Sequence, residues 1–421
     1  MQNFLNFKKW EEWIKPFFWG SFFLIFFGLY TSVTFISLGI VLFVGTFLLL
    51  QKNLTDWAKI TSTPVFWPTL SLILVILVSI LLAPPYDFSK PLAKTKYLFL
   101  YLFLIQAFQS AEPFKNRLLS LAALLNITFG ISCIFQYYGI FWLPEFFGLL
   151  EFSPFPESEK RYLASGFLSH HIHFTTNALF LYHLSLSALF NSKERGKKLL
   201  HTAACFFSVI AIFLSFSRSG WIGLIVSTLL VTFIRSRKMA LKTLLTIGIA
   251  ALIATASSGT VRQRIENFNP KANRDRLGVW YISMDMFKNS PLIGQGYHSF
   301  SSWSEKYYRQ YGLWADHPRD PHSMYLDMLG GTGIIGFIAF LTFMAFHLYL
   351  LFKAFFRKTP SPPNLQDKIF LLAIVGGFSG YLVMGVFNDQ FFITYNLMAL
   401  LFFLSLGVGI AQKLTPLQNH D

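Results

Sequence analysis

The chain has 421 residues, of which 54% are hydrophobic and only 13% charged, and Phe occurs 50 times. Because soluble domains usually carry ~25% charged residues, this composition argues against a soluble enzyme or regulator. The net charge of +15 would suggest nucleic acid as a partner of a soluble protein. Here the placement of Lys and Arg between membrane spans explains much of it, so no nucleic-acid partner is expected.

The first apolar run, from Phe17 to Leu50, contains no charged residue. As a single helix it would be about 51 Å long at ~1.5 Å per residue, against a hydrocarbon core of ~30 Å. We therefore expect two short spans that turn near Thr31 and Ser32. The apolar runs of the chain do not alternate with a period of two, so they predict helices and not a β-barrel.

Ten further spans are predicted in chain order, which gives an all-α polytopic membrane protein with about 12 transmembrane helices. Residues 1–258 then hold the first nine spans, residues 259–322 form a large, partly helical loop, and residues 323–421 hold the last three. The approximate bounds of the ten spans are Val65–Ala83, Lys96–Ser110, Leu118–Tyr138, Ile172–Phe190, Leu199–Ser217, Gly220–Ile234, Leu241–Ser257, Ser323–Phe352, Ile369–Phe387 and Phe391–Ala411.

Clusters of Lys and Arg lie in alternate loops, and two of the most basic are Asn191–Lys198 and Arg235–Lys242. Because short basic loops face the cytoplasm, both termini are expected there. The two largest loops, Gly139–His171 and Gly259–His322, then lie on the extracytoplasmic face. The second of these is basic. Long loops are exempt from the charge rule, so its cations need another explanation.

A polar loop meets an apolar run at RDPHSMYLDMLGGTGIIG, Arg319 to Gly336. Asp320 can cap the helix that starts here, and Pro321 suits the first helical position. His322 would then lie in the first turn, where the partial positive charge of a helix N-terminus disfavours imidazolium. A neutral His can act as a general base near pH 7. Taken alone, this pattern fits a helix-end His slightly better than a catalyst.

Arginines on the extracytoplasmic face form the second signal. Arg218, in SFSRSG, lies between two predicted spans, where ionisable groups are costly and usually functional. The alternative is an interfacial Arg that reaches lipid phosphates, and function is the favoured reading. Arg274 and Arg276 precede an apolar face predicted from helical spacing, which comprises Leu277, Trp280, Tyr281, Met284 and Phe287.

Other polar residues on this face are possible substrate contacts, namely Arg161, Arg274, His317 and Asp389. For Asp389 a structural role in a tight turn is the default interpretation. The run SHHIH at Ser169–His173 has no Asp, Glu or Cys nearby in the sequence to complete a metal site, and we find no clustered carboxylates on this face. We therefore expect no metal and no cofactor. Arginines beside a His suit a lipid-linked phosphate.

These motifs resemble the O-antigen ligase and polymerase superfamily of bacterial membrane glycosyltransferases. The resemblance rests on SRSGW (Ser217–Trp221), RLGVW (Arg276–Trp280), NSPLIGQGYHSF (Asn289–Phe300) and PHSMYLDMLGGTGIIG (Pro321–Gly336). It implies an O-antigen ligase of the bacterial inner membrane, which transfers a polysaccharide from undecaprenyl pyrophosphate to a sugar hydroxyl of lipid A–core in lipopolysaccharide biosynthesis.

By the same resemblance, Arg218 and Arg276 match the arginines that bind the pyrophosphate, and His322 matches the catalytic base of a metal-independent, inverting transfer. The active site would face the periplasm. The family often has His-Asn where this chain has His322-Ser323. An O-antigen polymerase of the same superfamily shares the donor chemistry, and the sequence does not separate the two. A transporter of a small anion or lipid is a further alternative, but it would predict mid-span charges and repeats with broken helices.

Overall fold

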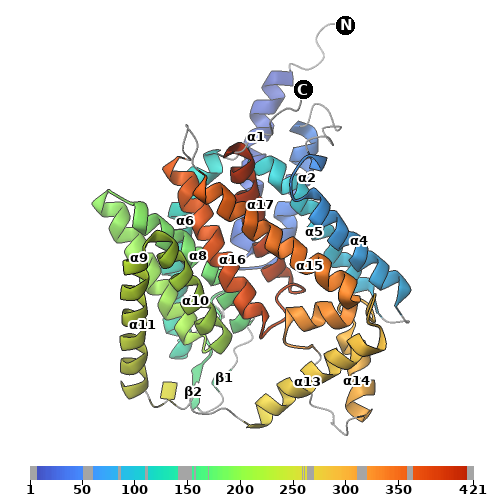
Figure 1. Cartoon of the computed structure of the whole chain (residues 1–421). Coiled ribbons are helices and arrows are strands. Elements are labelled where there is room, and N and C mark those ends of the chain that lie inside the picture. Colours follow the sequence, from blue (N-terminus) through green and yellow to red (C-terminus); the bar gives the residue numbers. More distant parts are fainter. Residues whose placement is uncertain are drawn as a thin grey trace, which may run out of the picture.

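The computed structural model describes residues 7–50, 60–83, 87–109, 112–140, 154–155, 158–168, 170–257, 259, 261–262, 270–310, 320–357 and 364–414. These residues form a bundle of long helices, with two helices of the predicted outer loop at one end (Figure 1). The long helices are α1 (Phe7–Gly28), α2 (Val33–Leu50), α4 (Phe66–Leu82), α5 (Ser89–Phe108), α6 (Glu112–Tyr137), α8 (His171–Asn191), α9 (Arg195–Leu214), α10 (Arg218–Arg235), α11 (Arg237–Ser257), α15 (Met324–Phe356), α16 (Leu365–Gly385) and α17 (Thr394–Leu414).

The helical architecture confirms the predicted fold class, and the two helices α1 and α2 confirm the turn near Thr31 and Ser32. Among the described residues, seven helices are long and apolar enough to cross a membrane, and α4 is a shorter apolar helix. The total of 12 spans therefore stays a prediction. The described residues also include one pair of short antiparallel strands, β1 (Pro154–Phe155) and β2 (Ser158–Tyr162), which the all-α prediction did not foresee.

The bundle is organised around α16 and α17, which lie near its centre in Figure 1. In their apolar windows 78% and 83% of the residues are buried, against 28% in α2. Aromatic rings fill the contact between α17 and its neighbours, since Phe402 packs edge-on against Phe108 and Phe114. In contrast, α11 exposes Leu244, Leu252 and other apolar side chains, as expected of a helix that faces lipid.

Two helices, α13 (Pro270–Asn289) and α14 (Phe300–Gln310), lie at the end of the bundle opposite the start of α1 and the end of α17 (Figure 1). The helix predicted around Trp280 is confirmed, and the predicted apolar face is not the face that packs on the bundle. Tyr281 is 68% exposed, whereas Val279, Ile282 and Met286 are buried. The buried face packs on α15, where Gly330 lies against Ser283 and Met286. The face of α13 that packs on the bundle is therefore the one that fits the small glycine surface of α15. The spacing of large apolar residues in α13 did not predict it.

Helix α15 is interrupted at Gly333, whose φ of 64° and ψ of −168° are not helical. Such a conformation is open essentially only to glycine. The connection from α13 to α14 uses this break, because the backbone N–H groups of Gln295 and Gly296 donate to the carbonyls of Gly330 and Gly331 at 3.1 and 2.9 Å. The glycines that follow His322 thus admit a segment of the chain itself, and they fix the position of the residues just after Gly296.

Candidate functional site

A polar cavity of about 400 Å³ lies where the approach to α15 meets the start of α8, the start of α14 and the connection between α16 and α17. Its lining includes four histidines, two aspartates, Asn388 and Gln390, together with Phe392. The histidines are His170, His173, His298 and His322, and the aspartates are Asp320 and Asp389. Of the residues predicted for the site, the structure therefore brings His322 and Asp389 together.

His322 does not lie in the first turn of a helix, so this prediction and the capping role of Asp320 were wrong. The cap is Ser323, whose Oγ accepts from the backbone N–H of Leu326 at 3.4 Å, and the helix begins at Met324. The carboxylate of Asp320 is instead used by His322 itself. Its Oδ1 accepts from the His322 backbone N–H at 2.9 Å and lies 2.9 Å from the ring Nδ1. His322 has a left-handed backbone, with φ of 48°.

This arrangement changes the physical argument for His322 as a base. A carboxylate at Nδ1 holds the ring in one orientation and leaves Nε2 as the nitrogen for a substrate proton. Burial alone would raise the pKa of Asp320, but the hydrogen bonds and charge of His322 outweigh burial and lower it. Asp320 is therefore ionised at neutral pH and can stabilise the imidazolium that forms when His322 takes a proton.

A second His–Asp cluster lies on the same cavity. The Nδ1 of His298 is 3.0 Å from Oδ2 of Asp327 and 3.2 Å from Oδ2 of Asp389. Its ring stacks on Phe392 at a centroid distance of 3.2 Å, and its φ is 54°. Burial alone would lower the pKa of His298, but Asp327 and then Asp389 outweigh it and raise the pKa to about 10. His298 is therefore an imidazolium at neutral pH.

Asp389 is the member of this cluster whose carboxylate is least well satisfied. Its side chain is 6% exposed, and within the described part of the chain neither of its oxygens accepts a hydrogen bond. Burial and then the charge of Asp327 raise its pKa above the ordinary value, and His298 only partly opposes this. Buried polar groups are rarely left without partners, and those that are tend to cluster at functional sites.

The carboxylates of Asp327 and Asp389 correct the expectation that this face has no carboxylate cluster. With His298 they form a set whose ligand atoms all lie within 4.8 Å of one another, close enough to hold a metal ion. A metal-ligating His almost always donates its second ring N–H to a protein partner, and no described residue bonds to Nε2 of His298. We interpret the cluster as an imidazolium held between two carboxylates. The absence of a metal from the site stays a prediction.

Arg218 begins α10, directly after the cap Ser217, and is half-buried. It is linked to the cavity through its neighbour Ser219, whose Oγ accepts from Nδ2 of Asn388 at 2.8 Å. Arg276, on α13, is half-buried and is not among the residues that line the cavity. The side chains of Arg161 and Arg274, and the whole of His317, lie outside the described residues.

Sequence reasoning missed His298 and Asp327. A signal existed for Asp327, because it is an acidic residue one turn into a long apolar helix, and such residues are functional candidates by default. His298 lies in the NSPLIGQGYHSF motif, but that motif does not indicate its partners. His298 follows the glycine loop Gly294–Gly296, and its partners come from sequence positions 29 and 91 residues away (327 − 298 and 389 − 298).

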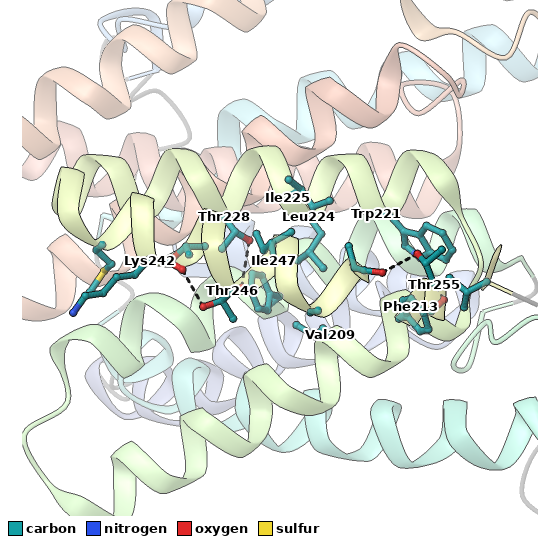
Figure 2. Close-up of a pocket in the computed structure, with 16 residues that line it drawn as sticks. Val209, Phe213, Trp221, Leu224, Ile225, Thr228, Lys242, Thr246, Ile247 and Thr255 are labelled. Atoms are coloured by element: carbon teal, nitrogen blue, oxygen red, sulfur yellow. Dashed lines mark hydrogen bonds between the residues drawn. The ribbon is translucent and has the colours of Figure 1, made fainter. Parts of the chain in front are cut away.

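A larger cavity, of about 520 Å³, lies between α9, α10 and α11 (Figure 2). It is lined mainly by apolar side chains such as Trp221, Leu224 and Ile225. Lys242 is the charged residue of its lining, at one end in the view of Figure 2. Thr246 and Thr255 donate to the backbone carbonyls of Lys242 and Ala251 at 2.9 and 2.8 Å, and Thr228 donates to the Tyr182 hydroxyl at 3.3 Å. This cavity has no acid–base pair, so size does not identify the reactive site.

A sequence model of the O-Antigen ligase family matches residues 203–341. The match confirms the resemblance to the O-antigen ligase superfamily and indicates a membrane glycosyltransferase-like protein that acts on glycan and lipid substrates. The matched segment contains Arg218, Arg276, His298, His322 and Asp327, whereas the α16–α17 connection with Asp389 lies beyond it. No curated protein matches the chain.

Proposed function

We propose that this chain is an O-antigen ligase of the bacterial inner membrane. It would transfer a polysaccharide from undecaprenyl pyrophosphate to a sugar hydroxyl of lipid A–core, in the biosynthesis of lipopolysaccharide. The observation that carries the proposal is the Asp320–His322 pair on a polar cavity, inside the segment matched by the family. A base oriented by a carboxylate is what deprotonation of a sugar hydroxyl requires.

In the proposed reaction, Nε2 of His322 takes the proton of the acceptor hydroxyl. The acceptor oxygen forms a bond to the anomeric carbon of the donor glycan while the bond from that carbon to the pyrophosphate oxygen breaks. A single displacement of this kind inverts the anomeric configuration. Arg218 and Arg276 would bind the pyrophosphate and stabilise the charge that develops on it as it leaves, since guanidinium groups match phosphate oxygens in a forked geometry. No metal is needed for this step.

The proposal includes the orientation in the membrane. The cytoplasmic side would hold both termini and the basic loops, such as Asn191–Lys198, and the cavity would open to the periplasm. Arg161, Arg274, His317 and Asp389 are further proposed substrate contacts. Of these, Asp389 has the firmest basis because it lines the cavity.

The test is reconstitution of the purified chain with a lipid-linked glycan and a lipid A–core acceptor, in the presence of EDTA. Transfer to lipid A–core is the expected result. Growth of the glycan on its donor lipid, without transfer to lipid A–core, would show a polymerase instead. A requirement for added divalent metal would overturn the metal-independent mechanism. An Arg218→Ala variant is expected to lose affinity for the donor, and unchanged donor binding would contradict its phosphate role.

A further inference from the structure

The cavity holds two histidines in different electrostatic environments. His322 has one carboxylate partner, Asp320, and the side chains of His322 and Asp320 are 32% and 41% exposed. His298 has two carboxylate partners, and its side chain is 18% exposed while those of Asp327 and Asp389 are 4% and 6% exposed. When neighbouring titratable groups lie in such different environments, they take different acid–base roles. His322 suits proton transfer, whereas His298 suits a permanent positive charge.

The ring of His298 is held in one orientation by three contacts. Both carboxylates engage Nδ1, and Phe392 covers one face of the ring. His298 lines the cavity, and no described residue bonds to its Nε2. A protonated ring fixed in this way has one N–H group left to donate, and the cavity is where a partner for it can enter.

Charge decides what kind of ligand this donor meets. The cavity wall and its immediate support contain three carboxylates, those of Asp320, Asp327 and Asp389. The arginines proposed for the pyrophosphate, Arg218 and Arg276, do not line it. These three carboxylates outnumber the two cations beside them, the His298 imidazolium and Lys94 near Asp389, so a phosphate in this cavity would face net negative charge. A neutral sugar is compatible, because its hydroxyl groups can both donate and accept hydrogen bonds.

We propose that this cavity is the binding site for the acceptor sugar, and that His298 is a specificity-determining residue that donates Nε2–H to a ring or hydroxyl oxygen of that sugar. The inference rests on the proposed function for the identity of the sugar as the acceptor. His298 keeps its proton throughout and forms or breaks no covalent bond. The pyrophosphate stays outside the cavity, on the side of Arg218, and the acceptor hydroxyl meets His322 inside it.

The variants are His298→Gln and His298→Ala, with His183→Gln as the matched control. His183 is also buried, but its ring lies 2.8 Å from Ser227 Oγ, away from the cavity. A hydrogen bond to a charged group contributes ~1.5–3 kcal/mol, which corresponds to a change of about 10- to 100-fold in affinity. We therefore expect KM for the acceptor to rise by about that factor in His298→Ala, while KM for the donor is unchanged. His183→Gln should change neither.

A pH profile separates this role from a structural one. Three carboxylates face His298, namely Asp327 on α15, Asp389 on the α16–α17 connection and Asp320 before α15. Other titratable groups nearby are the cavity histidines His170, His173 and His322, and Lys94, which lies near Asp389. In the wild type the acceptor KM should stay constant from about pH 6 to about pH 9, because this whole range lies below the raised pKa of His298, about 10. In Asp327→Asn the acceptor KM should rise as the pH exceeds neutrality, because His298 then loses its proton.

Direct binding keeps this inference separate from the proposed function. The probe is a lipid-free core oligosaccharide without phosphate, titrated into the full-length protein in detergent, with the same oligosaccharide carrying phosphate groups as the comparison. We expect the neutral probe to bind wild type about 10- to 100-fold more tightly than His298→Gln or His298→Ala, and the phosphorylated probe to bind less well. Equal affinities of wild type and both variants, or no binding to wild type, would overturn the inference. Absence of glycan transfer with normal probe binding would instead contradict the proposed function.

Discussion

The two ends of α16 each carry a buried aspartate, and the two are satisfied differently. At the start of the helix, Asp367 lies 2.9 Å from Nζ of Lys115, with side chains 3% and 2% exposed. Just beyond its end, Asp389 shares a single His298 with Asp327 and accepts no hydrogen bond from the described residues. The first cluster balances its charges within the protein. The second also has Lys94 near Asp389, but it leaves carboxylate oxygens without hydrogen-bond donors among the described residues and borders a cavity, so it has reason to bind something else.

This difference in hydrogen-bond partners distinguishes a structural aspartate from a functional one more clearly than the extent of burial does. Both aspartates are deeply buried and both belong to ion pairs, but Asp367 has Lys115 as a cation of its own, whereas Asp389 shares His298 with Asp327. Groups left without partners in a folded protein tend to mark sites where function outweighs stability.

The largest effect is expected at the cavity, from His322→Ala. Loss of a positioned general base typically lowers a rate by ~10²–10⁴-fold, so transfer of glycan should fall by that factor. Because His322 is 32% exposed and lies before the helix, the melting temperature in detergent should stay close to that of the wild type. A properly inserted variant with full activity would contradict the assignment of His322 as the base.

The next largest effect is expected at the other end of α16, from Asp367→Ala, and it should appear in stability. This substitution leaves the Lys115 ammonium buried without its carboxylate, and breaking a buried pair in this way costs ~3–5 kcal/mol. Thermal unfolding in detergent measures it. The matched control is Glu194→Ala, which removes the partner of Lys197 in a pair whose side chains are 69% and 63% exposed and should cost less than ~1 kcal/mol. If the two substitutions cost the same, the buried pair does not stabilise the bundle as described.

Much of the arrangement around α16 could be predicted from the sequence. Continuous apolar runs and the distribution of Lys and Arg located the helices, and α16, predicted as Ile369–Phe387, is observed as Leu365–Gly385. Among the ten spans predicted after the first two, the largest difference is at α5, which starts at Ser89 and not at Lys96. The family motifs placed Arg218 and His322 in one functional segment. These features depend on local pattern, and local pattern is what a sequence displays.

The cluster at the end of α16 could not be predicted in this way. It is made of residues from three separate segments, and they meet because Gly333 interrupts α15 and admits the loop at Gly294–Gly296. The prediction that Asp320 caps α15 was wrong for a related reason. Asp320 and Ser323 are both good caps by type, and only the contact of Asp320 with the His322 ring decides that Ser323 does the capping.

A smaller effect is expected from Asp389→Asn, and in contrast to Asp367→Ala it should appear in activity more than in stability. The substitution removes a desolvated charge that accepts no hydrogen bond from the described residues, and Asp327 remains as the partner of His298. The free energy of unfolding should therefore change by less than ~1 kcal/mol or increase, in contrast with the ~3–5 kcal/mol lost on breaking a pair. Activity should fall about 10-fold through loss of a charged contact. A large loss of stability with normal specific activity would reverse the comparison between the two ends.

The smallest effect on stability is expected from Asp320→Asn, and it should depend on pH. The pKa of Asp320 is lower in the folded chain than its ordinary value, so its carboxylate stabilises the fold above the unfolded-state pKa, and this contribution is lost as the pH falls through the folded-state pKa. With a side chain 41% exposed, the contribution should stay below ~1 kcal/mol. Unfolding measured at pH 7 should show the wild type slightly more stable than Asp320→Asn, and at a pH below the folded-state pKa the two should coincide. If the difference in stability between the two proteins persists at acid pH, the carboxamide of Asp320→Asn fails to accept the backbone N–H of His322. The turn before α15, more than the charge of Asp320, would then hold the His322 ring in place.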